Sequence, residues 1–220
     1  MPAVPPAPTF RQRGFTLTEM AVVLAIVALL IGGMILPLSA QQDLRNNAAT
    51  EKLLADVGEA LYGFAASHAA GDGKPYLPCP DTDGDGVENR SGSACVSQDG
   101  DLPWADLGLG RQDAWGTPLR YAVTAVFSDS TTGFTLMSLG TLQVCPENTC
   151  ATVLASAVPA VIHSRGKNGA AAPAGADEAD NADGVPNFVQ REHDASFDDV
   201  VAWLPPGILI NRMIAAGKLP

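Results

Sequence analysis

The sequence predicts an α+β protein in which one long N-terminal helix packs on a small antiparallel sheet. Three patterns support this class. Residues 20–36 carry no charged or strongly polar side chain. In residues 44–65, apolar side chains recur at steps of three and four. The second half of the chain contains short segments in which apolar and polar residues alternate. The first two patterns are typical of a helix, and the third is typical of strands joined by short connections.

Three parts are expected along the chain. Residues 1–14 form a leader, residues 15–70 form the long helix, and residues 71–220 form an exported globular domain. Residues 15–36 would be transmembrane, because a helix over this range covers roughly 30 Å, about the thickness of the bilayer core. Arg11 and Arg13 precede the helix, and the positive-inside tendency would keep the N-terminus in the cytoplasm.

Glu19 interrupts the apolar segment close to its start. An ionised carboxylate inside a membrane costs about 2.5–3.5 kcal/mol unless it is paired. A buried carboxylate therefore needs a compensating cation, and Glu19 is a candidate functional residue.

Residues 13–19 read RGFTLTE and, together with the apolar run behind them, resemble the class III signal of type IV pilins and type II secretion pseudopilins. The resemblance implies a pilin-like fold and a structural role rather than an enzyme. It implies that a prepilin peptidase cuts after Gly14 and methylates the new amine of Phe15. Glu19 would then pair with the Phe15 amine of the neighbouring subunit as the filament assembles.

The same resemblance implies the partners and the location of the protein. The partners would be other pilin or pseudopilin subunits, the prepilin peptidase, an inner-membrane assembly platform and the membrane itself. The chain would cross the inner membrane once, with its C-terminal domain in the periplasm, or outside the cell in a surface pilus. The machine could be a type II secretion system or a type IV pilus.

Two other interpretations of the N-terminus stay open. One is an ordinary transmembrane anchor. The other is a secretory signal with a small-residue cleavage site at Leu38-Ser39-Ala40, which would release a calcium-binding module. Both leave Glu19 unexplained.

The charge and the polar motifs exclude several classes of function. The formal net charge is −11, and loss of the two leader arginines would make it −13, so the surface repels nucleic acid and no such partner is expected. The chain contains no Gly-x-Ser-x-Gly, His-Glu-x-x-His or phosphate-loop motif. We therefore expect no catalytic residue and three structural histidines, His68, His163 and His193.

The remaining elements follow from local patterns. Past Pro37 the helix is expected to continue until the glycines at 71–73, with an apolar face made of Leu44, Ala48, Leu54, Val57, Leu61, Phe64 and Ala65. Residues 78–100 are expected to form loops. The tail should hold a strand and then a short helix, and the alternating segments predict strands at residues 119–127, 134–144, 158–163 and 197–203, with the helix at 208–216.

The four cysteines predict two disulfides, because an exported domain folds in an oxidising compartment. Pairing nearest neighbours joins Cys79 with Cys95 and Cys145 with Cys150, at the lowest entropic cost of loop closure. The first bond would stabilise the fold by about 3 kcal/mol. Zinc is the alternative, but neither pair has Cys-x2-Cys spacing.

A first possible calcium site is the segment DTDGDG at residues 81–86. Its alternating carboxylates, Asp81, Asp83 and Asp85, match the first half of a calcium loop. The match ends at Gly92, where a bidentate glutamate would be needed. The segment is either an isolated calcium loop, with Glu88 or Asn89 as a further donor, or an acidic solvated turn.

Two later segments are similar to the type II secretion major pseudopilin. Residues 113–121 read DAWGTPLRY and match its Asp-x-Trp-Gly-x-Pro-x-x-Tyr segment, and residues 164–169 read SRGKNG and resemble its Ser-x-Gly-x-Asp-Gly loop. That loop holds calcium in the family. The resemblance implies a second possible calcium site that uses Asn168, in place of the aspartate, with Asp177 and Asp180.

Overall fold

The computed structural model describes residues 14–184 and 186–220, and it leaves the side chains of residues 33–38 undescribed. Nearly all of the expected leader therefore lies outside the described residues. The chain separates into two compact units, residues 1–43 and 44–220.

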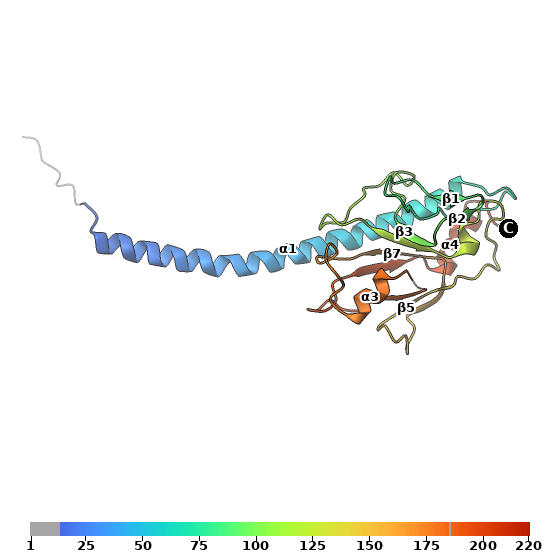
Figure 1. Ribbon diagram of the computed structural model, residues 1–220. Coiled ribbons are helices and arrows are strands. Elements are labelled where there is room, and N and C mark those ends of the chain that lie inside the picture. Colours follow the sequence, from blue (N-terminus) through green and yellow to red (C-terminus); the bar gives the residue numbers. More distant parts are fainter. Residues whose placement is uncertain (1–13, 185) are drawn as a thin grey trace, which may run out of the picture. The chain divides into compact units, whose positions relative to one another are not determined.

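Helix α1 (Leu17–Ser67) confirms the long N-terminal helix (Figure 1). Its buried face begins at Thr50 and continues through Leu54, Val57, Leu61, Phe64 and Ala65. The predicted apolar face was wrong at Leu44 and Ala48, which are exposed because they precede the part of the helix that the domain covers.

A four-stranded antiparallel sheet forms the centre of the domain. It contains β3 (Asp99–Asp101), β4 (Arg120–Val123), β7 (Ala160–Ser164) and β9 (Val200–Trp203), in that order. A second sheet has the order β6 (Ala155–Val158), β5 (Leu142–Cys145) and β8 (Asn187–Val189), and a small hairpin pairs β1 (Arg90–Ser91) with β2 (Ala94–Cys95). The antiparallel sheet was expected, but the parallel pairing of β5 with β8 was not.

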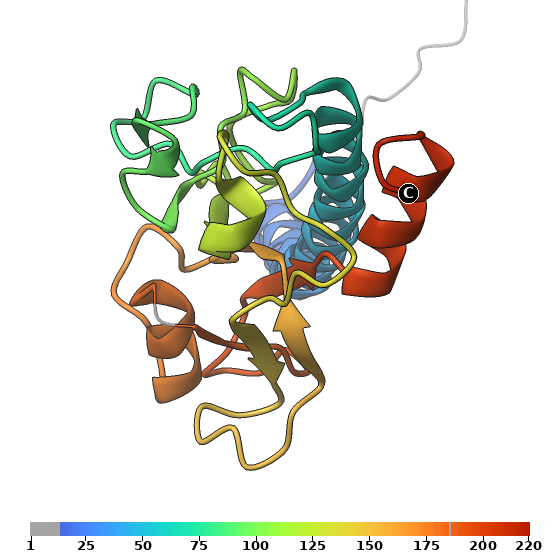
Figure 2. The same ribbon diagram turned by 90° about the vertical axis from the view of Figure 1, so that its right-hand side faces the viewer.

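The central sheet is covered on both faces, because alternate side chains of a strand point in opposite directions. Tyr121 and Val123 of β4 lie in one core cluster together with Leu54 and Leu61 of α1. Ala122, between them, lies in a second cluster with Val144 of β5, Phe188 of β8 and other residues of the second sheet. The domain therefore has three layers, with α1 on one face of the central sheet and the smaller sheet on the other (Figure 2).

Two of the predicted strands are shorter than expected. The strand at 119–127 ends at Val123, and a helical turn, α2 (Ala125–Ser128), follows it. The strand at 134–144 is reduced to β5, and a turn replaces its first part. The core still receives the apolar side chains of Phe127 and Phe134, whose rings lie 5.0 Å apart, although neither residue is on a strand.

Other segments agree more closely with the sequence. Pro159 separates β6 from β7, so the predicted strand at 158–163 belongs to both sheets. Helix α4 (Pro206–Ala215) confirms the C-terminal helix, and Gly217 ends it with a φ of 69°. Helix α3 (Ala176–Ala182) contains Asp177 and Asp180 of the second expected calcium site.

The disulfide pairing is confirmed. Cys79 bonds Cys95 and Cys145 bonds Cys150, and no cysteine is free. The first bond closes the segment that contains Asp81, Asp83 and Asp85.

Candidate functional site

The start of α1 is held by the side chains of Thr16 and Glu19. The Thr16 hydroxyl accepts the Glu19 N–H at 3.2 Å, and the Glu19 carboxylate accepts the Thr16 N–H at 2.8 Å. This reciprocal pattern is a capping box, which satisfies N–H groups that have no partner within the helix. The Thr-x-x-Glu spacing of this capping box is visible in the sequence.

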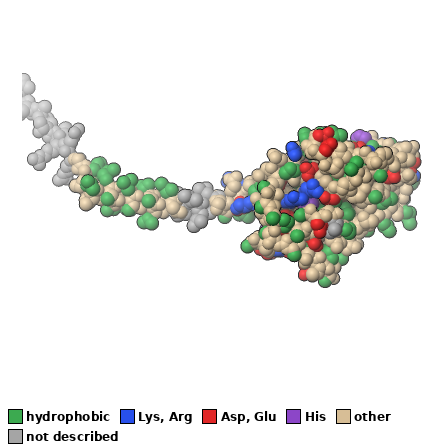
Figure 3. Space-filling view, viewed as in Figure 1, with side chains coloured by type: hydrophobic (Ala, Val, Ile, Leu, Met, Phe, Trp, Pro, Cys, Tyr) green, Lys and Arg blue, Asp and Glu red, His purple; other side chains and the backbone are tan. Residues whose placement is uncertain are grey.

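Apolar side chains cover the first half of α1. Phe15 is 82 % exposed, and most of the large apolar residues between Leu17 and Ile31 are also exposed (Figure 3). Isolated exposed apolar residues are ordinary, but a continuous apolar helix surface is typical of a helix that contacts lipid or another protein. In the described part of the chain, no helix meets the length and hydropathy needed to cross a membrane.

The Asp81 loop brings three carboxylates together. Asp81, Asp83 and Asp85 each place one oxygen within 4.8 Å of the others. Asp81 is buried and accepts the backbone N–H groups of Asp83, Gly84 and Gly86 at 2.7–3.0 Å. Burial raises the pKa of Asp81, but these N–H groups lower it by more, so the net shift is downward.

The two further donors expected for this loop are engaged elsewhere. The Glu88 carboxylate accepts the Cys79 N–H at 2.8 Å and pairs with the Arg90 guanidinium at 2.8 Å. Asn89 accepts the Thr82 N–H through its side-chain oxygen. The Asn89 side-chain N–H also donates to the Asp83 carboxylate at 3.4 Å, so Asn89 contacts the carboxylate group as a hydrogen-bond donor.

A second carboxylate group differs from the set expected in this region. It consists of Glu178, Asp198 and Asp199, whose oxygens lie within 4.8 Å of one another, and we call it the buried acid cluster. Glu178 and Asp199 are each 3 % exposed, and Asp198 is partly exposed. Asp198 and Asp199 were not singled out in the sequence, because nothing in their spacing links them to a segment twenty residues earlier.

Helical geometry explains why Asp177 and Asp180 are outside the cluster. On α3, residues three apart share a face, so Glu178 and Asn181 turn inward together while Asp177 and Asp180 lie on the other side. Asp177 pairs with Arg191 at 2.7 Å instead. Of the expected ligand set, Asn168 therefore lies beside the cluster, whereas Asp177 and Asp180 are not part of it.

Asn168 lies beside the cluster as a hydrogen-bond donor. Its side-chain N–H groups donate to both oxygens of Glu178 at 3.0 and 3.2 Å, and its backbone N–H donates to Asp198 at 3.1 Å. Glu178 also accepts the N–H groups of Ala174 and Asp198. Each Glu178 oxygen thus accepts two hydrogen bonds, which leaves Asp198 and Asp199 as the carboxylates with free lone pairs.

Burial opposes ionisation of Asp199 in the buried acid cluster. Burial, together with the nearby Glu178 and Asp198 carboxylates, raises the pKa of Asp199 to about 7 against the opposing effects of Asn181 and Arg165. The Asp198 Oδ1 atom is buried and has no hydrogen-bond partner among the described residues. Gly166 makes room for it, since a Cβ there would approach this oxygen to 2.6 Å. Buried carboxylate oxygens are the donors that a hard cation such as Ca²⁺ prefers, so this set fits the ion.

Comparison with known families identifies the N-terminal segment. The family model described as the prokaryotic N-terminal methylation motif matches residues 9–35. The chain carries the type IV pilin and pseudopilin signature. No curated protein and no solved structure matched the chain.

The pilin and pseudopilin signature has direct consequences. It implies a type IV pilin-like protein that a prepilin peptidase processes, and it implies assembly with other pilin subunits. It also favours a structural role over an enzymatic one. It further favours a membrane-anchored or pilus-associated location. The α+β architecture is consistent with a pilin-like fold.

The two segments that resemble the major pseudopilin meet in space. Asp113 is buried and accepts the backbone N–H groups of Trp115 and Thr117 at 2.9 Å, which shapes its turn. The Ser164 hydroxyl donates to the same carboxylate at 2.5 Å. Asp113 therefore ties the turn before β4 to the end of β7, where the loop toward the buried acid cluster begins.

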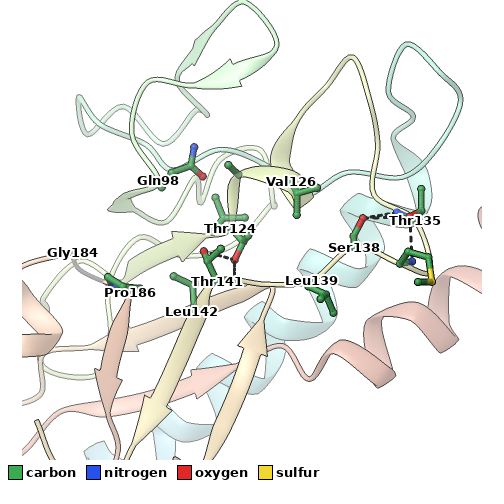
Figure 4. Close-up of a pocket in the computed structure, with 13 residues that line it drawn as sticks. Gln98, Thr124, Val126, Thr135, Ser138, Leu139, Thr141, Leu142, Gly184 and Pro186 are labelled. Carbon is green, nitrogen blue, oxygen red and sulfur yellow. Dashed lines mark hydrogen bonds between the residues drawn. The ribbon is translucent and has the colours of Figure 1, made fainter. Parts of the chain in front are cut away.

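An apolar groove of about 800 Å³ lies beside α2 (Figure 4). Its lining includes Val126, Leu139, Leu142 and Pro186, and no charged side chain among the described residues lines it. The Thr124 hydroxyl in its lining is already bonded to the Thr141 N–H and the Val158 carbonyl. The groove offers apolar contact surface rather than catalytic groups.

Proposed function

We propose that this protein is a structural subunit of a type II secretion or type IV pilus filament, as a pseudopilin or minor pilin. The proposal rests on the position of the methylation motif relative to the start of α1. Gly14 and the exposed Phe15 directly precede the capping box, and Glu19 lies in the first turn of the helix. Cleavage after Gly14 would place the Phe15 amine at the start of an apolar helix.

We favour a pseudopilin over a surface pilin. The support comes from the two segments that resemble the major pseudopilin, which Asp113 and Ser164 join by a hydrogen bond. The protein would cross the inner membrane once, with its domain in the periplasm, and would work with the prepilin peptidase and an inner-membrane assembly platform. Shearing of native cells tests this choice, because a pseudopilin stays with the envelope whereas a surface pilin is released with extracellular filaments.

Processing at Gly14 is the first expected outcome. Mass spectrometry of the protein from its native host should find N-methylated Phe15 as the first residue. Gly14→Val should block cleavage without a steric conflict, because a Cβ at this position would meet no atom within 4 Å. A mature N-terminus at Gln41 would contradict the proposal and favour a calcium-binding module released by an ordinary signal peptidase.

We also propose that the domain binds calcium at the buried acid cluster. The fit of the donor set and the buried, unpartnered Asp198 Oδ1 support this site. A bound divalent ion would supply the positive charge that the buried carboxylates lack. Asp198 and Asp199 would hold it, while Glu178 would add negative charge and organise the loop. The Asp81 loop is the second candidate, supported by its three converging carboxylates.

A further inference from the structure

Asn181 connects the buried acid cluster to the smaller sheet. Its side-chain amide is 2 % exposed and donates to Asp199 Oδ2 at 2.8 Å and to the Val189 carbonyl at 3.1 Å. The Asn181 Oδ1 atom accepts the Val189 N–H at 2.7 Å. One side chain thus contacts a carboxylate of the cluster and both main-chain polar groups of a strand residue.

Val189 belongs to β8, an edge strand of the three-stranded sheet. The main-chain polar groups of the flanking residues Phe188 and Gln190 point toward β5. The Gln190 N–H, for example, donates to the Cys145 carbonyl at 2.9 Å. The free edge of β8 would otherwise leave buried main-chain groups unpaired, because Val189 is buried. The Asn181 amide takes the place of a neighbouring strand at this point.

The amide also orients Asp199. It holds one oxygen of that carboxylate, and no hydrogen bond to the other oxygen is found among the described residues. Carboxylates that bind metal ions are usually held by such outer hydrogen bonds, and loss of one typically weakens metal binding 10–100-fold. Only an amide serves both contacts, because a carboxylate at 181 could not donate to Asp199 and an aliphatic side chain could do neither.

We propose that Asn181 is a positioning residue of the calcium site, which orients Asp199 for the ion and couples ion binding to the β8 edge of the smaller sheet. The proposal rests on calcium binding at the buried acid cluster. An ion that fixes Asp199 also fixes Asn181 and hence the Val189 N–H. Calcium should therefore protect an amide in the smaller sheet whose own residue does not contact the ion.

Calcium titration by calorimetry tests the first half of the proposal. The full chain is used in detergent, in an Asp83→Ala, Asp85→Ala background that removes the Asp81 loop as a second site. Asn181→Leu should weaken calcium binding 10–100-fold. Asp180→Asn is the matched control on the same helix, because it removes a charge outside the cluster, and it should leave the affinity unchanged.

Hydrogen exchange in the unsubstituted chain tests the second half and does not depend on the folding of a variant. Saturating calcium should slow exchange of the Val189 amide far more than exchange of the Phe134 amide, which bonds the Pro75 carbonyl and belongs to neither carboxylate group. If calcium binds but Val189 exchanges at the same rate, or a folded Asn181→Leu binds as tightly as its background, Asn181 has only a structural role. If the background protein binds no calcium, the site itself is wrong and this inference falls with it.

Discussion

At the scale of single residues, the Glu19 carboxylate has two possible partners, one within the subunit and one in the proposed filament. Within one subunit, Glu19 completes a capping box with Thr16, an arrangement worth about 1 kcal/mol to a helix. The proposed role in the filament needs the same carboxylate as a partner for an amine. A variant that removes the whole side chain would confound these two roles.

Glu19→Gln separates them. Glutamine also completes a capping box, so the helix start should be preserved, but the neutral amide cannot pair with the Phe15 amine. We expect Glu19→Gln to be processed normally and to be incorporated poorly into filaments, measured by cross-linking to neighbouring subunits in the native host. Thr16→Ala is the matched control, since it weakens the cap and keeps the charge. Incorporation of Glu19→Gln at the level of the unsubstituted protein would contradict the pairing role.

His163 is the residue whose burial predicts a pH effect. Burial, together with the nearby Arg120 and Arg165 guanidinium groups, lowers its pKa to about 3. An unfolded histidine has a pKa of about 6.5. The folded pKa is the lower one, so between pH 6.5 and 3 the unfolded chain binds more protons and stability falls as the pH falls.

At pH 5 this linkage removes about 2 kcal/mol of the free energy of unfolding. His163→Leu keeps an apolar side chain of similar size next to Phe188 and should abolish this part of the acid sensitivity. Urea unfolding at pH 7.5 and pH 5 measures it, with the exposed His68→Leu as control. Equal pH dependence in His163→Leu and the unsubstituted chain would show that His163 titrates normally in the fold.

At the scale of elements, the Cys79–Cys95 bond closes the Asp81 loop and the Cys145–Cys150 bond closes a much shorter one. The sequence separations are 16 and 5 residues. In the chain-entropy model, these loops correspond to about 3 and about 2 kcal/mol of stabilisation.

Replacing both cysteines of a pair by serine should therefore destabilise the domain more for the Cys79–Cys95 pair than for the Cys145–Cys150 pair. Urea midpoints of the Cys79→Ser, Cys95→Ser variant and of the Cys145→Ser, Cys150→Ser variant measure the two losses. A larger loss from the second pair would show that the contacts of the bonds, rather than loop closure, decide their contribution.

At the scale of the whole molecule, the excess of carboxylates makes stability depend on divalent ions. The mature chain would carry a charge of about −13, and three of the carboxylates form the buried acid cluster. An ion bound only by the folded state stabilises it by about 2.7 kcal/mol at a hundredfold excess over the dissociation constant. For a chain of this size, that raises the melting temperature by roughly 5–10 °C.

We expect the full chain to melt higher in calcium than in chelator, with a smaller effect of magnesium, which requires stricter geometry. Asp198→Asn should remove the calcium shift because it takes away a free carboxylate of the cluster, and Asp180→Asn should keep it. Thermal unfolding followed by circular dichroism measures each shift. A shift that survives Asp198→Asn but disappears in Asp83→Ala, Asp85→Ala would place the ion in the Asp81 loop.

The sequence by itself determined the features that depend on neighbours along the chain. The methylation motif, the extent of α1, the C-terminal helix and both disulfides follow from short spacings and periodicity. Strand ends were less accurate, because Phe127 and Phe134 reach the core from a helical turn and a loop as well as they would from a strand.

Only the tertiary structure decided which carboxylates converge. Asp198 and Asp199 precede β9, and they meet Glu178 because α3 folds as a helix and turns Glu178 and Asn181 inward. The parallel pairing of β5 with β8 was equally invisible in the sequence. In both cases the contacts join segments far apart in the chain, and their formation depends on burial by the whole domain rather than on any local preference.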